Sequence, residues 1–365
     1  MKIKKIAIVQ RVITDYRVNF FNTLNNLLKN ENIELTIYAG NGKNSEKFKD
    51  GLEEIKCAKR VNNYYILNTR FYYQNIYSAL NQYDIVIVEQ ANSAILNYLL
   101  LFQKHILNVN KKLAFWGHGA TLSKKNNSLS NNFKKLFINK SDYWFGYTEH
   151  TRKILNENGV KNHKISIINN SIDMKIVDKN HIQSKVKNNR VVFCSRLYDK
   201  KKIPFIIESC IRAKKEIKDL ELFIIGDGPD FQKIKKLVNN VDWIKMTGAL
   251  FNEEKRKILT SSQLMVLPSF LGLSILDAFS SGLPVLTTNL KNHGPEISYL
   301  ENGINGLKTN LDVDEFSNAI VNILKDKLKL NEMSKAALET ANKFTVEKMA
   351  ENFVSGIKNI TIDKY

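Results

Sequence analysis

Short apolar segments alternate with stretches of helical periodicity along the whole chain, and no other feature of the sequence restricts the fold as much. Each segment has the length and the Val, Ile and Leu content of one buried strand. Such alternation is typical of a parallel sheet with helices on both faces. The first half supplies predicted strands at residues 4–9, 34–38, 85–89, 112–116, 143–147 and 164–168, and the second half at residues 190–194, 220–225, 243–247, 264–268 and 284–287.

A polar segment at residues 178–189, without apolar periodicity, separates the two sets of strands and is predicted to be a linker. A chain of 365 residues also exceeds what one hydrophobic core usually organises. We predict two Rossmann-like domains, at residues 1–180 and 181–345, and a helix at 346–365 that returns toward the first domain. Two such domains face a central cleft, and ligands bind at the carboxyl ends of the strands.

Cysteine usage and hydropathy indicate where the protein works. The three cysteines are far apart and in no CxxC pattern, which argues against a disulfide framework or a zinc site and favours a reducing cytoplasm. The N-terminal apolar core is too short for a signal peptide. The longest apolar run, at residues 94–102, is much shorter than the roughly 20 residues that span a bilayer. We expect a cytoplasmic protein, either soluble or attached peripherally to the inner face of the cell membrane.

The positive charge is concentrated in the first half of the chain. The formal net charge is +19, and residues 1–180 hold 27 Lys and Arg against 14 Asp and Glu. Residues 101–140 contain eight lysines and no acid, and residues 59–73 mix basic with aromatic side chains. This pattern suits an anionic membrane surface, a nucleic acid or a phosphorylated lipid. A lysine-rich and asparagine-rich genome composition is the alternative explanation.

Two basic side chains follow the first strand of the second half. The loop after residues 190–194 carries Arg196 and Lys201, and a predicted helix begins directly after it. A planar guanidinium and an ammonium near a helix start suit a diphosphate. A solvated basic loop is the alternative.

Another turn of interest lies in residues 268–285, which read PSFLGLSILDAFSSGLPV. The chain turns at Gly272 and enters a helix that carries one acid, Asp277. A helix N-terminus has unpaired N–H groups and a partial positive charge, so this turn is suited to an anion. An ordinary strand-to-helix connection is the alternative. Gly226 also lies in a tight turn after a strand, but that turn lacks the third glycine of a dinucleotide fingerprint.

Two turns of the first half offer polar side chains at the same kind of position. His118 lies between two glycines directly after a predicted strand, and its near-neutral pKa suits hydrogen bonding or proton handling at a hydroxyl. The turn after the first strand offers Asp15, Tyr16 and Arg17 as acceptor-side candidates. No paired carboxylates, HExxH motif, nucleophile elbow or Walker A motif occurs, which argues against hydrolases, metalloproteases and NTPases.

An ordered set of motifs resembles glycosyltransferase family four, whose members are retaining enzymes of the GT-B fold. The first half agrees at residues 15–21 and 168–173, so the resemblance covers nearly the whole chain. The motifs of the second half are Arg196 with Lys201, IIGDGP at 224–229, TG at 247–248, LPS at 267–269, GLS at 272–274 with Asp277, SGLPV at 281–285 and ENGINGL at 301–307.

The resemblance implies a diphosphate site. Arg196 and Lys201 match the family residues that hold the donor diphosphate, and with His118 they are the predicted catalytic residues. The turn of Gly272, Leu273 and Ser274 matches the one whose backbone N–H groups cradle this diphosphate.

The same resemblance implies the contacts of the nucleoside and the sugar. Asp277 matches the acid that binds the ribose hydroxyls, and Thr247 and Gly248 match the wall around the base. Gly226 belongs to the same predicted donor site. His118 matches a histidine that lies near the donor sugar and the acceptor.

Two positions depart from the family pattern of paired glutamates. Ser269 stands at the first position, so no carboxylate is available there for the sugar hydroxyls, and Asp277 at the second is one methylene shorter than glutamate. Glu296, in an HGPE segment, is the candidate to supply part of the missing contact. The GLS turn and the HGPE segment resemble a bacterial subset found among surface-polysaccharide enzymes.

We therefore expect a retaining hexosyltransferase that moves a sugar from a nucleotide diphosphate donor, in the first place a UDP-sugar. The expected acceptor is a glycan on a polyprenyl diphosphate at an anionic membrane, in O-antigen or capsule biosynthesis. We expect no metal, no other cofactor and no nucleic acid. A nucleotide-sugar 2-epimerase of the same fold is one alternative, although Ser269 removes a carboxylate it would need. A basic nucleic-acid-binding protein is the other, although it would not require the ordered turns of the second half.

Overall fold

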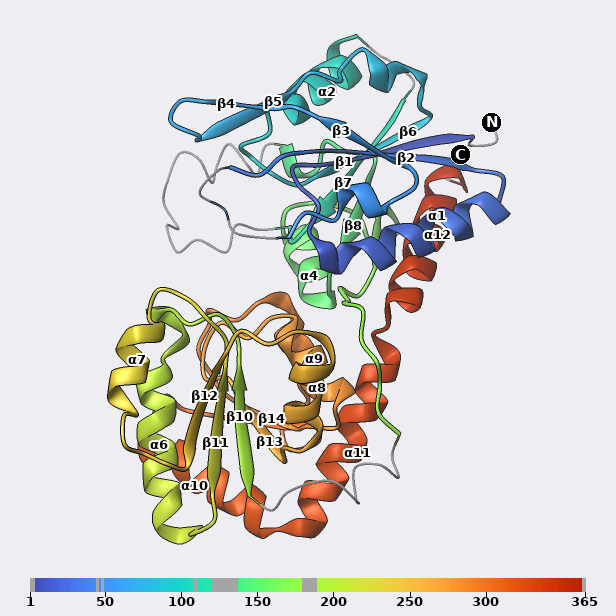
Figure 1. Cartoon of the computed structure of the whole chain (residues 1–365). Coiled ribbons are helices and arrows are strands. Elements are labelled where there is room, and N and C mark those ends of the chain that lie inside the picture. The colour runs from blue at the N-terminus through green and yellow to red at the C-terminus, as the bar shows by residue number, and fades with distance from the viewer. Residues whose placement is uncertain are drawn as a thin grey trace. The chain divides into compact units, whose positions relative to one another are not determined.

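The structure is a computed structural model that describes residues 4–43, 46, 49–107, 111–119, 137–178 and 189–362 (Figure 1). The chain forms two compact units, one of Met1–Asp173 with Thr345–Tyr365 and one of Met174–Phe344. The sequence placed the boundaries at residues 180 and 345. Most of the predicted linker, residues 179–188, lies outside the described residues.

In the described part of the first unit, seven parallel strands form one sheet in the order β3-β2-β1-β6-β7-β8-β9. Strand β1 is buried on both faces from Ile6 to Val9, as expected for a parallel sheet covered by helices. A separate antiparallel hairpin joins β4 and β5. The strands are β1 (Lys5–Gln10), β2 (Glu34–Gly40), β3 (Ala58–Val61), β4 (Asn63–Ile66), β5 (Phe71–Gln74), β6 (Ile85–Glu89), β7 (Lys112–Gly117), β8 (Tyr143–Gly146) and β9 (Ile165–Ile167).

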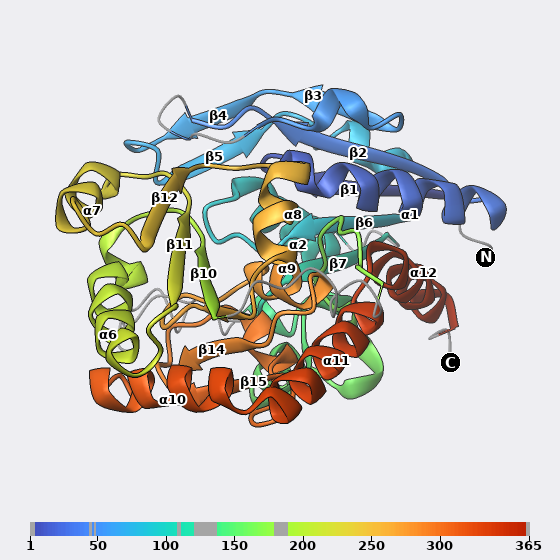
Figure 2. The ribbon, with the colours of Figure 1, turned by 60° about the horizontal axis from the view of Figure 1, so that its bottom comes forward.

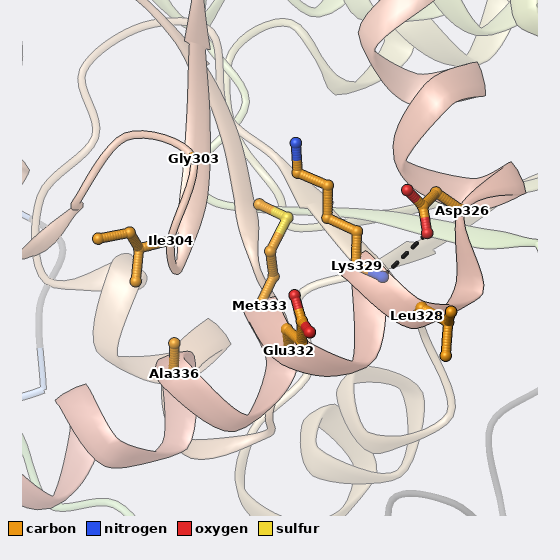
Figure 3. Close-up of a pocket in the computed structure, with 8 residues that line it drawn as sticks. All are labelled: Gly303, Ile304, Asp326, Leu328, Lys329, Glu332, Met333 and Ala336. Carbon is orange, nitrogen blue, oxygen red and sulfur yellow. Dashed lines mark hydrogen bonds between the residues drawn. The ribbon is translucent and has the colours of Figure 1, made fainter.

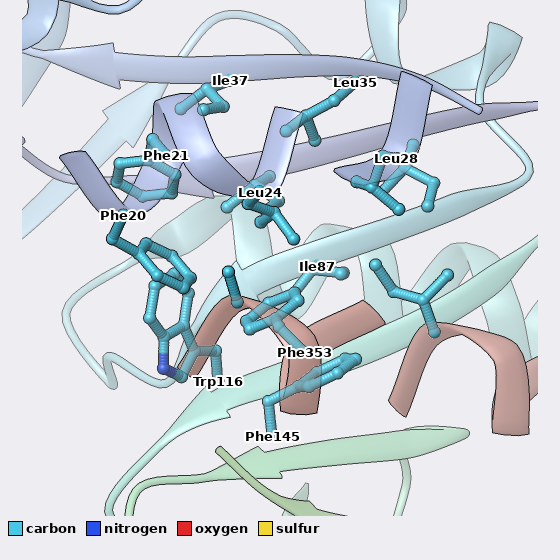
Figure 4. Close-up of a cluster of buried hydrophobic side chains, with 14 of the residues drawn as sticks. Phe20, Phe21, Leu24, Leu28, Leu35, Ile37, Ile87, Trp116, Phe145 and Phe353 are labelled. Carbon is cyan, nitrogen blue, oxygen red and sulfur yellow. The ribbon is translucent and has the colours of Figure 1, made fainter. Parts of the chain in front are cut away.

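Helix α12 (Val346–Ile362) completes the core of the first unit, together with α1 (Val18–Asn30). Met349 and Phe353 of α12 are fully buried. The Phe353 ring stacks on Phe145 with centroids 4.2 Å apart, beside Phe20 and Trp116 (Figure 4). The C-terminal segment thus packs into the unit that the N-terminal segment forms. The other helices here are α2 (Ile95–Ile106), α4 (Glu149–Glu157), η1 (Asp15–Arg17), η2 (Leu52–Glu54), η3 (Ala79–Gln82) and η4 (Asn162–Lys164).

Among the described residues of the second unit, six parallel strands follow the order β12-β11-β10-β13-β14-β15. They are β10 (Arg190–Cys194), β11 (Glu221–Ile225), β12 (Ile244–Gly248), β13 (Leu264–Val266), β14 (Val285–Thr288) and β15 (Gly306–Thr309). The helices are α6 (Ile203–Glu216), α7 (Phe231–Leu237), α8 (Asn252–Thr260), α9 (Ser274–Ser280), α10 (Val313–Lys325), α11 (Lys327–Lys343), η5 (Asp199–Lys201) and η6 (Pro295–Tyr299). Helices α6 and α7 lie on one side of this sheet, and α8 and α9 lie on the other (Figures 1 and 2).

This architecture confirms the predicted fold of two Rossmann-like parallel sheets. Every predicted strand is present within two residues of its predicted ends. The helix predicted at residues 346–365 is described as α12 (Val346–Ile362). It is separated from α11 (Lys327–Lys343) at residues 344–345, where the chain passes from one unit to the other.

In each unit the strand order reverses at one central strand. Strand β1 lies between β2 and β6, and β10 lies between β11 and β13. Doubly wound sheets bind ligands at the carboxyl edge beside such a reversal, because the two flanking connections leave in opposite directions. The loops that follow β10 and β13 therefore hold the first candidate site of the second unit.

Candidate functional site

Lys201 lies at the reversal in the second unit. It ends η5, in the loop that follows β10, and only 6% of the residue is exposed. Its Nζ donates a hydrogen bond to the carbonyl oxygen of Phe270, 2.7 Å away, in the loop that follows β13. Phe270 has a left-handed backbone with φ of 51°, which is uncommon for a bulky residue and turns the chain at this point. Lys201 thus joins the two loops that flank the reversal.

The Lys201 ammonium forms no ion pair with any carboxylate that the structure describes. Burial lowers the pKa of Lys201 to about 8. A buried cation whose partner is a neutral carbonyl costs free energy, and an anion bound beside it would offset that cost. The loop therefore has the electrostatics of an anion site.

Arg196 and Lys200 lie in the same loop but differ from Lys201 in burial. Both are exposed. The Nζ of Lys200 lies 5.8 Å from the centroid of the Phe270 ring. The buried Lys201 instead donates a hydrogen bond to the backbone carbonyl oxygen of Phe270. The two adjacent lysines therefore differ in burial and in their contacts, a difference that the sequence alone does not show.

His293 fixes the shape of the loop that follows β13. Its Nδ1 accepts a hydrogen bond from the backbone N–H of Leu271 at 3.1 Å, and its Nε2 lies 2.9 Å from the carbonyl oxygen of Thr288. This arrangement requires the neutral ring with the proton on Nε2. Burial lowers the pKa of His293, which favours the same form. His293 is therefore a structural clamp.

Glu296 lies directly beside the predicted phosphate-binding turn. The residue is only 4% exposed, and its Oε2 lies 3.7 Å from where a Cβ at Gly272 would be. A Cβ at Gly294 would come within 2.7 Å of the same oxygen, so glycine at this position makes room for the carboxylate. The structure thus brings Glu296 and Gly272 together.

Ser269 is fully buried, and Asn292 takes up its hydrogen-bonding capacity. The Nδ2 of Asn292 donates to the Ser269 hydroxyl at 3.0 Å. The Oδ1 of Asn292 is buried and has no hydrogen-bond partner among the described residues. At the first position of the family's glutamate pair, where the sequence already shows Ser269, this chain therefore has a hydroxyl in contact with an amide.

The remaining predicted donor residues lie at the ends of β11 and β12. Gly226 has a φ of 145°, and a Cβ there would come within 1.9 Å of the Ser195 carbonyl oxygen, so the close approach of two loops requires glycine. The N–H of Gly226 donates to the carbonyl oxygen of Gly248 at 2.8 Å. Thr247 is half-buried, and its hydroxyl donates to the same carbonyl oxygen at 3.0 Å.

The predicted turn of Gly272, Leu273 and Ser274 leads directly into α9. The N–H groups of Ile275 and Leu276 donate to the carbonyl oxygens of Gly272 and Leu273, both at 3.0 Å. The three turn residues are partly exposed at the carboxyl edge of the sheet.

Asp277 has a partner that the sequence analysis missed. Its Oδ1 lies 2.8 Å from the Nζ of Lys255, on α8. These residues are 22 positions apart, and α8 carries several other charged residues, so spacing gave no signal for the pair. The second unit therefore gathers Lys201, Glu296 and an ion-paired Asp277 at one edge of its sheet.

His118 lies at the carboxyl edge of the other sheet, directly after β7. Its ring centroid lies 4.6 Å from that of Tyr147, and its Nδ1 is buried with no hydrogen-bond partner in the described part of the chain. Burial, together with the charge of nearby Arg17, lowers the pKa of His118 to about 4. The imidazole is therefore neutral at physiological pH, which suits it to exchange hydrogen bonds with hydroxyl groups.

Arg17 is buried beside this histidine, with 8% exposed. Its NH2 donates to the Oδ1 of Asn170 at 2.5 Å, and its NH1 lies 3.4 Å from the sulfur of Met349. The guanidinium carbon lies 5.9 Å from the ring of Tyr147, on which His118 packs. Its burial and its hydrogen bond to Asn170 therefore hold the Arg17 side chain in place inside the first unit.

Asp15 and Tyr16 are exposed on η1, next to Arg17. The Asp15 carboxylate accepts a hydrogen bond from the backbone N–H of Tyr16 at 2.8 Å. The Tyr16 ring, in a residue that is 43% exposed, lies 5.1 Å from the Arg17 guanidinium carbon. The structure thus brings Tyr16, Arg17 and His118 into one cluster in the first unit, with Asp15 at its surface.

The second unit also has a surface hollow of about 510 Å³, whose lining residues are drawn in Figure 3. Its lining includes Ile304, Leu328 and Met333, and none of the predicted donor residues contributes. Ile304 precedes β15, so the hollow lies toward the amino ends of the strands. Parallel sheets bind their ligands at the other end.

Two features are absent from the residues that the structure describes. No three or more His, Cys, Asp or Glu side chains come together as a metal-ion site. No helix in these ranges has the length and apolar content needed to cross a membrane.

Comparison with known proteins identifies the family. Residues 19–175 match Glycosyltransferase Family 4, and residues 188–326 match Glycosyl transferases group 1. The poly(glycerol-phosphate) alpha-glucosyltransferase of Bacillus subtilis strain 168 is 29% identical over 178 residues, which make up 47% of this chain and 26% of that relative. The chain thus spans about a quarter of the length of this curated relative.

Solved structures share the whole fold at low sequence identity. HepE of Anabaena, in complex with UDP, is 16% identical with a TM-score of 0.70, covering 97% of this chain and 99% of HepE. The lipopolysaccharide outer core galactosyltransferase WaaB is also 16% identical, with a TM-score of 0.72 and the same coverage. The shared architecture is the GT-B fold, and the family matches in both units show that the chain belongs to glycosyltransferase family four.

Proposed function

We propose that this protein transfers a sugar from a nucleotide diphosphate donor to a lipid-linked glycan. The proposed donor is a UDP-sugar. The observation that carries the proposal is the buried Lys201 ammonium at the strand reversal of the second unit, held by a carbonyl and lacking a carboxylate partner in the described chain. The diphosphate of the donor carries negative charge, which would balance the Lys201 ammonium. The solved HepE complex with UDP supports the choice of nucleotide.

In the proposed reaction, the bond between the anomeric carbon and the diphosphate oxygen breaks while the acceptor hydroxyl oxygen bonds to that carbon from the same face. The hydroxyl proton ends on the departing nucleoside diphosphate. Lys201 and Arg196 stabilise the charge that develops on the diphosphate, a preorganised effect that needs no metal ion. Retention of the anomeric configuration follows the family resemblance.

The other candidate residues of the two units have separate roles in this proposal. Glu296 accepts hydrogen bonds from the donor sugar, because it is the buried carboxylate beside Gly272. Asp277 binds the ribose, and Thr247 and Gly248 border the base. His118 stays neutral and aligns a sugar hydroxyl instead of acting as a charged acid.

The acceptor in this proposal is a glycan on a polyprenyl diphosphate, made for O-antigen or capsule at the inner face of the cell membrane. The similarity to a lipopolysaccharide galactosyltransferase supports a surface polysaccharide as the product.

Helix α2 supports attachment to a membrane. Its apolar residues Leu99, Phe102 and Ile106, with the adjoining Leu107, are between 38% and 62% exposed. Residues 101–140 add eight lysines and no acid, although 108–110 and 120–136 lie outside the described residues. An apolar helix face with basic surroundings suits an anionic lipid surface.

A donor screen tests the proposal. The purified chain is incubated with a panel of nucleotide sugars, with and without extracted lipid-linked glycans, and consumed donors are identified by mass spectrometry. We expect one UDP-sugar to be consumed, with UDP released only when acceptor is present. Conversion of a nucleotide sugar to its 2-epimer without an acceptor would favour a 2-epimerase, and no consumption of any nucleotide sugar would contradict the proposal.

A further inference from the structure

We propose that Lys255 is a positioning residue that presents the Asp277 carboxylate to the ribose of the donor and thereby sets the preference for a ribonucleotide. This inference rests on the proposed function, because it deepens the role given there to Asp277. Lys255 belongs to none of the sequence motifs.

The geometry places the pair beside the predicted diphosphate site. Lys255 is on α8 and Asp277 is on α9, and their charged atoms lie 2.8 Å apart with 27% and 21% of the two side chains exposed. Burial raises the pKa of the Cys194 thiol, at the end of β10; the charge of Asp277 raises it further and that of Lys255 lowers it, so both charged groups lie near this thiol. The pair thus lies near the end of the strand whose loop carries Arg196 and Lys201, partly open to a ligand.

The ion pair leaves part of the carboxylate available. A carboxylate has two oxygens and about four lone-pair positions, and Lys255 contacts Oδ1. The pair holds the short aspartate in one orientation, so that Oδ2 can accept hydrogen bonds from ribose hydroxyls without first losing rotamer freedom. Burial lowers the pKa of Lys255, but the nearby Asp277 charge and hydrogen bond more than compensate, so the net pKa of Lys255 is raised and its ammonium stays charged at neutral pH.

The competing interpretation is an ion pair that only links α8 to α9. Such partly exposed pairs contribute little to stability. The two interpretations differ in a property that stability does not report, namely how strongly the protein distinguishes a ribonucleotide from its deoxy analogue.

The test is calorimetric titration of the full chain with UDP and with 2′,3′-dideoxy-UDP. Hydrogen bonds from hydroxyls to a carboxylate predict about tenfold or greater preference of the wild type for UDP. We expect Lys255→Met to reduce this ratio to about threefold or less and Lys255→Arg to restore most of it. Lys257→Met is the matched control, because it removes an exposed lysine of the same helix and should leave the ratio unchanged.

The possible results separate this inference from the function on which it rests. A Lys255→Met protein that binds UDP with an unchanged or larger ratio would overturn the inference alone. A Lys257→Met protein with the same loss of preference would also overturn it, because the effect would then reflect net charge. If neither nucleotide binds the wild type, the proposed donor and this inference both fail. Melting temperatures of all variants show whether each remains folded.

Discussion

At the scale of single residues, the buried charge of Lys201 destabilises the fold but is proposed to bind the donor diphosphate. Its pKa is about 8 in the folded chain against 10.5 ordinarily, so keeping the ammonium charged below pH 8 costs up to roughly 3 kcal/mol. Lys201→Met should therefore lose donor turnover but raise the melting temperature at pH 7. The folded state binds fewer protons than the unfolded state between about pH 8 and 10.5, so wild-type stability rises through that window and the advantage of Lys201→Met shrinks.

Calorimetry of both proteins at pH 7 and pH 10.5 measures this change. The same pKa predicts that affinity of the wild type for UDP falls above about pH 8, because deprotonated Lys201 no longer attracts the diphosphate. A variant that loses stability at pH 7 would show that the Phe270 hydrogen bond outweighs the burial cost.

His118 provides a second test at this scale. Burial is the larger cause of its low pKa and the Arg17 charge is the second, so Arg17→Met should raise the pKa from about 4 toward the ordinary value, and Arg17→Lys should raise it less. Carbon-13 labelled histidine NMR follows the titration, with His118→Gln to assign the signal.

His118→Ala should lower the rate of donor turnover, while UDP affinity and melting temperature stay nearly unchanged. A melting temperature lower by several degrees would instead indicate that His118 serves the fold.

At the scale of elements, helix α2 shows how one apolar run can have two environments. Leu96, Leu100 and Leu101 are buried in the core of the first unit, whereas Phe102 and Ile106 are exposed. The sequence shows only a short apolar run, and the helical phase in the structure divides it into two faces.

The exposed face of α2 predicts binding to anionic vesicles. Replacing Phe102 and Ile106 together by serine should reduce co-sedimentation with phosphatidylglycerol vesicles several-fold, because burial of apolar area in the lipid is lost. Added salt should weaken the wild type as well, since lysines near the surface contribute about 1 kcal/mol each. Ile211→Ser, on α6 of the other unit, is the control, because Ile211 is an isoleucine with 44% exposed. Equal binding to neutral vesicles, or an equal effect of Ile211→Ser, would contradict the account.

The elements missed by the sequence analysis share a physical cause. Strands β3 and β4 consist of partly buried and exposed residues only, and β3 lies at the edge of its sheet. Strand β15 is the edge of the other sheet. Such edge strands owe their pairing to neighbours and lack the continuous apolar runs that revealed the central strands.

At the scale of the whole molecule, the sequence was sufficient for the fold and the family. The alternating strands predict two parallel sheets, and the ordered motifs indicate glycosyltransferase family four, which the comparisons confirm. Site geometry was less accessible. No spacing along the chain encodes three of the contacts. The pair of Lys255 and Asp277 joins two helices, whereas the contacts of Asn292 with Ser269 and of His293 with Leu271 join loops that follow different strands.

In the proposed reaction, Lys201 and Arg196 stabilise the departing diphosphate without a metal ion. The most direct measurement is donor turnover in EDTA by the wild type and by Lys201→Ala, Arg196→Ala and Lys200→Ala. Loss of one such contact costs about 3 kcal/mol of transition-state stabilisation, or roughly a hundredfold in rate. We expect the wild type to remain active in EDTA, Lys201→Ala and Arg196→Ala each to show that loss, and Lys200→Ala to be nearly unchanged. Wild-type activity abolished by EDTA, or a Lys200→Ala loss as large as that of Lys201→Ala, would contradict the claim.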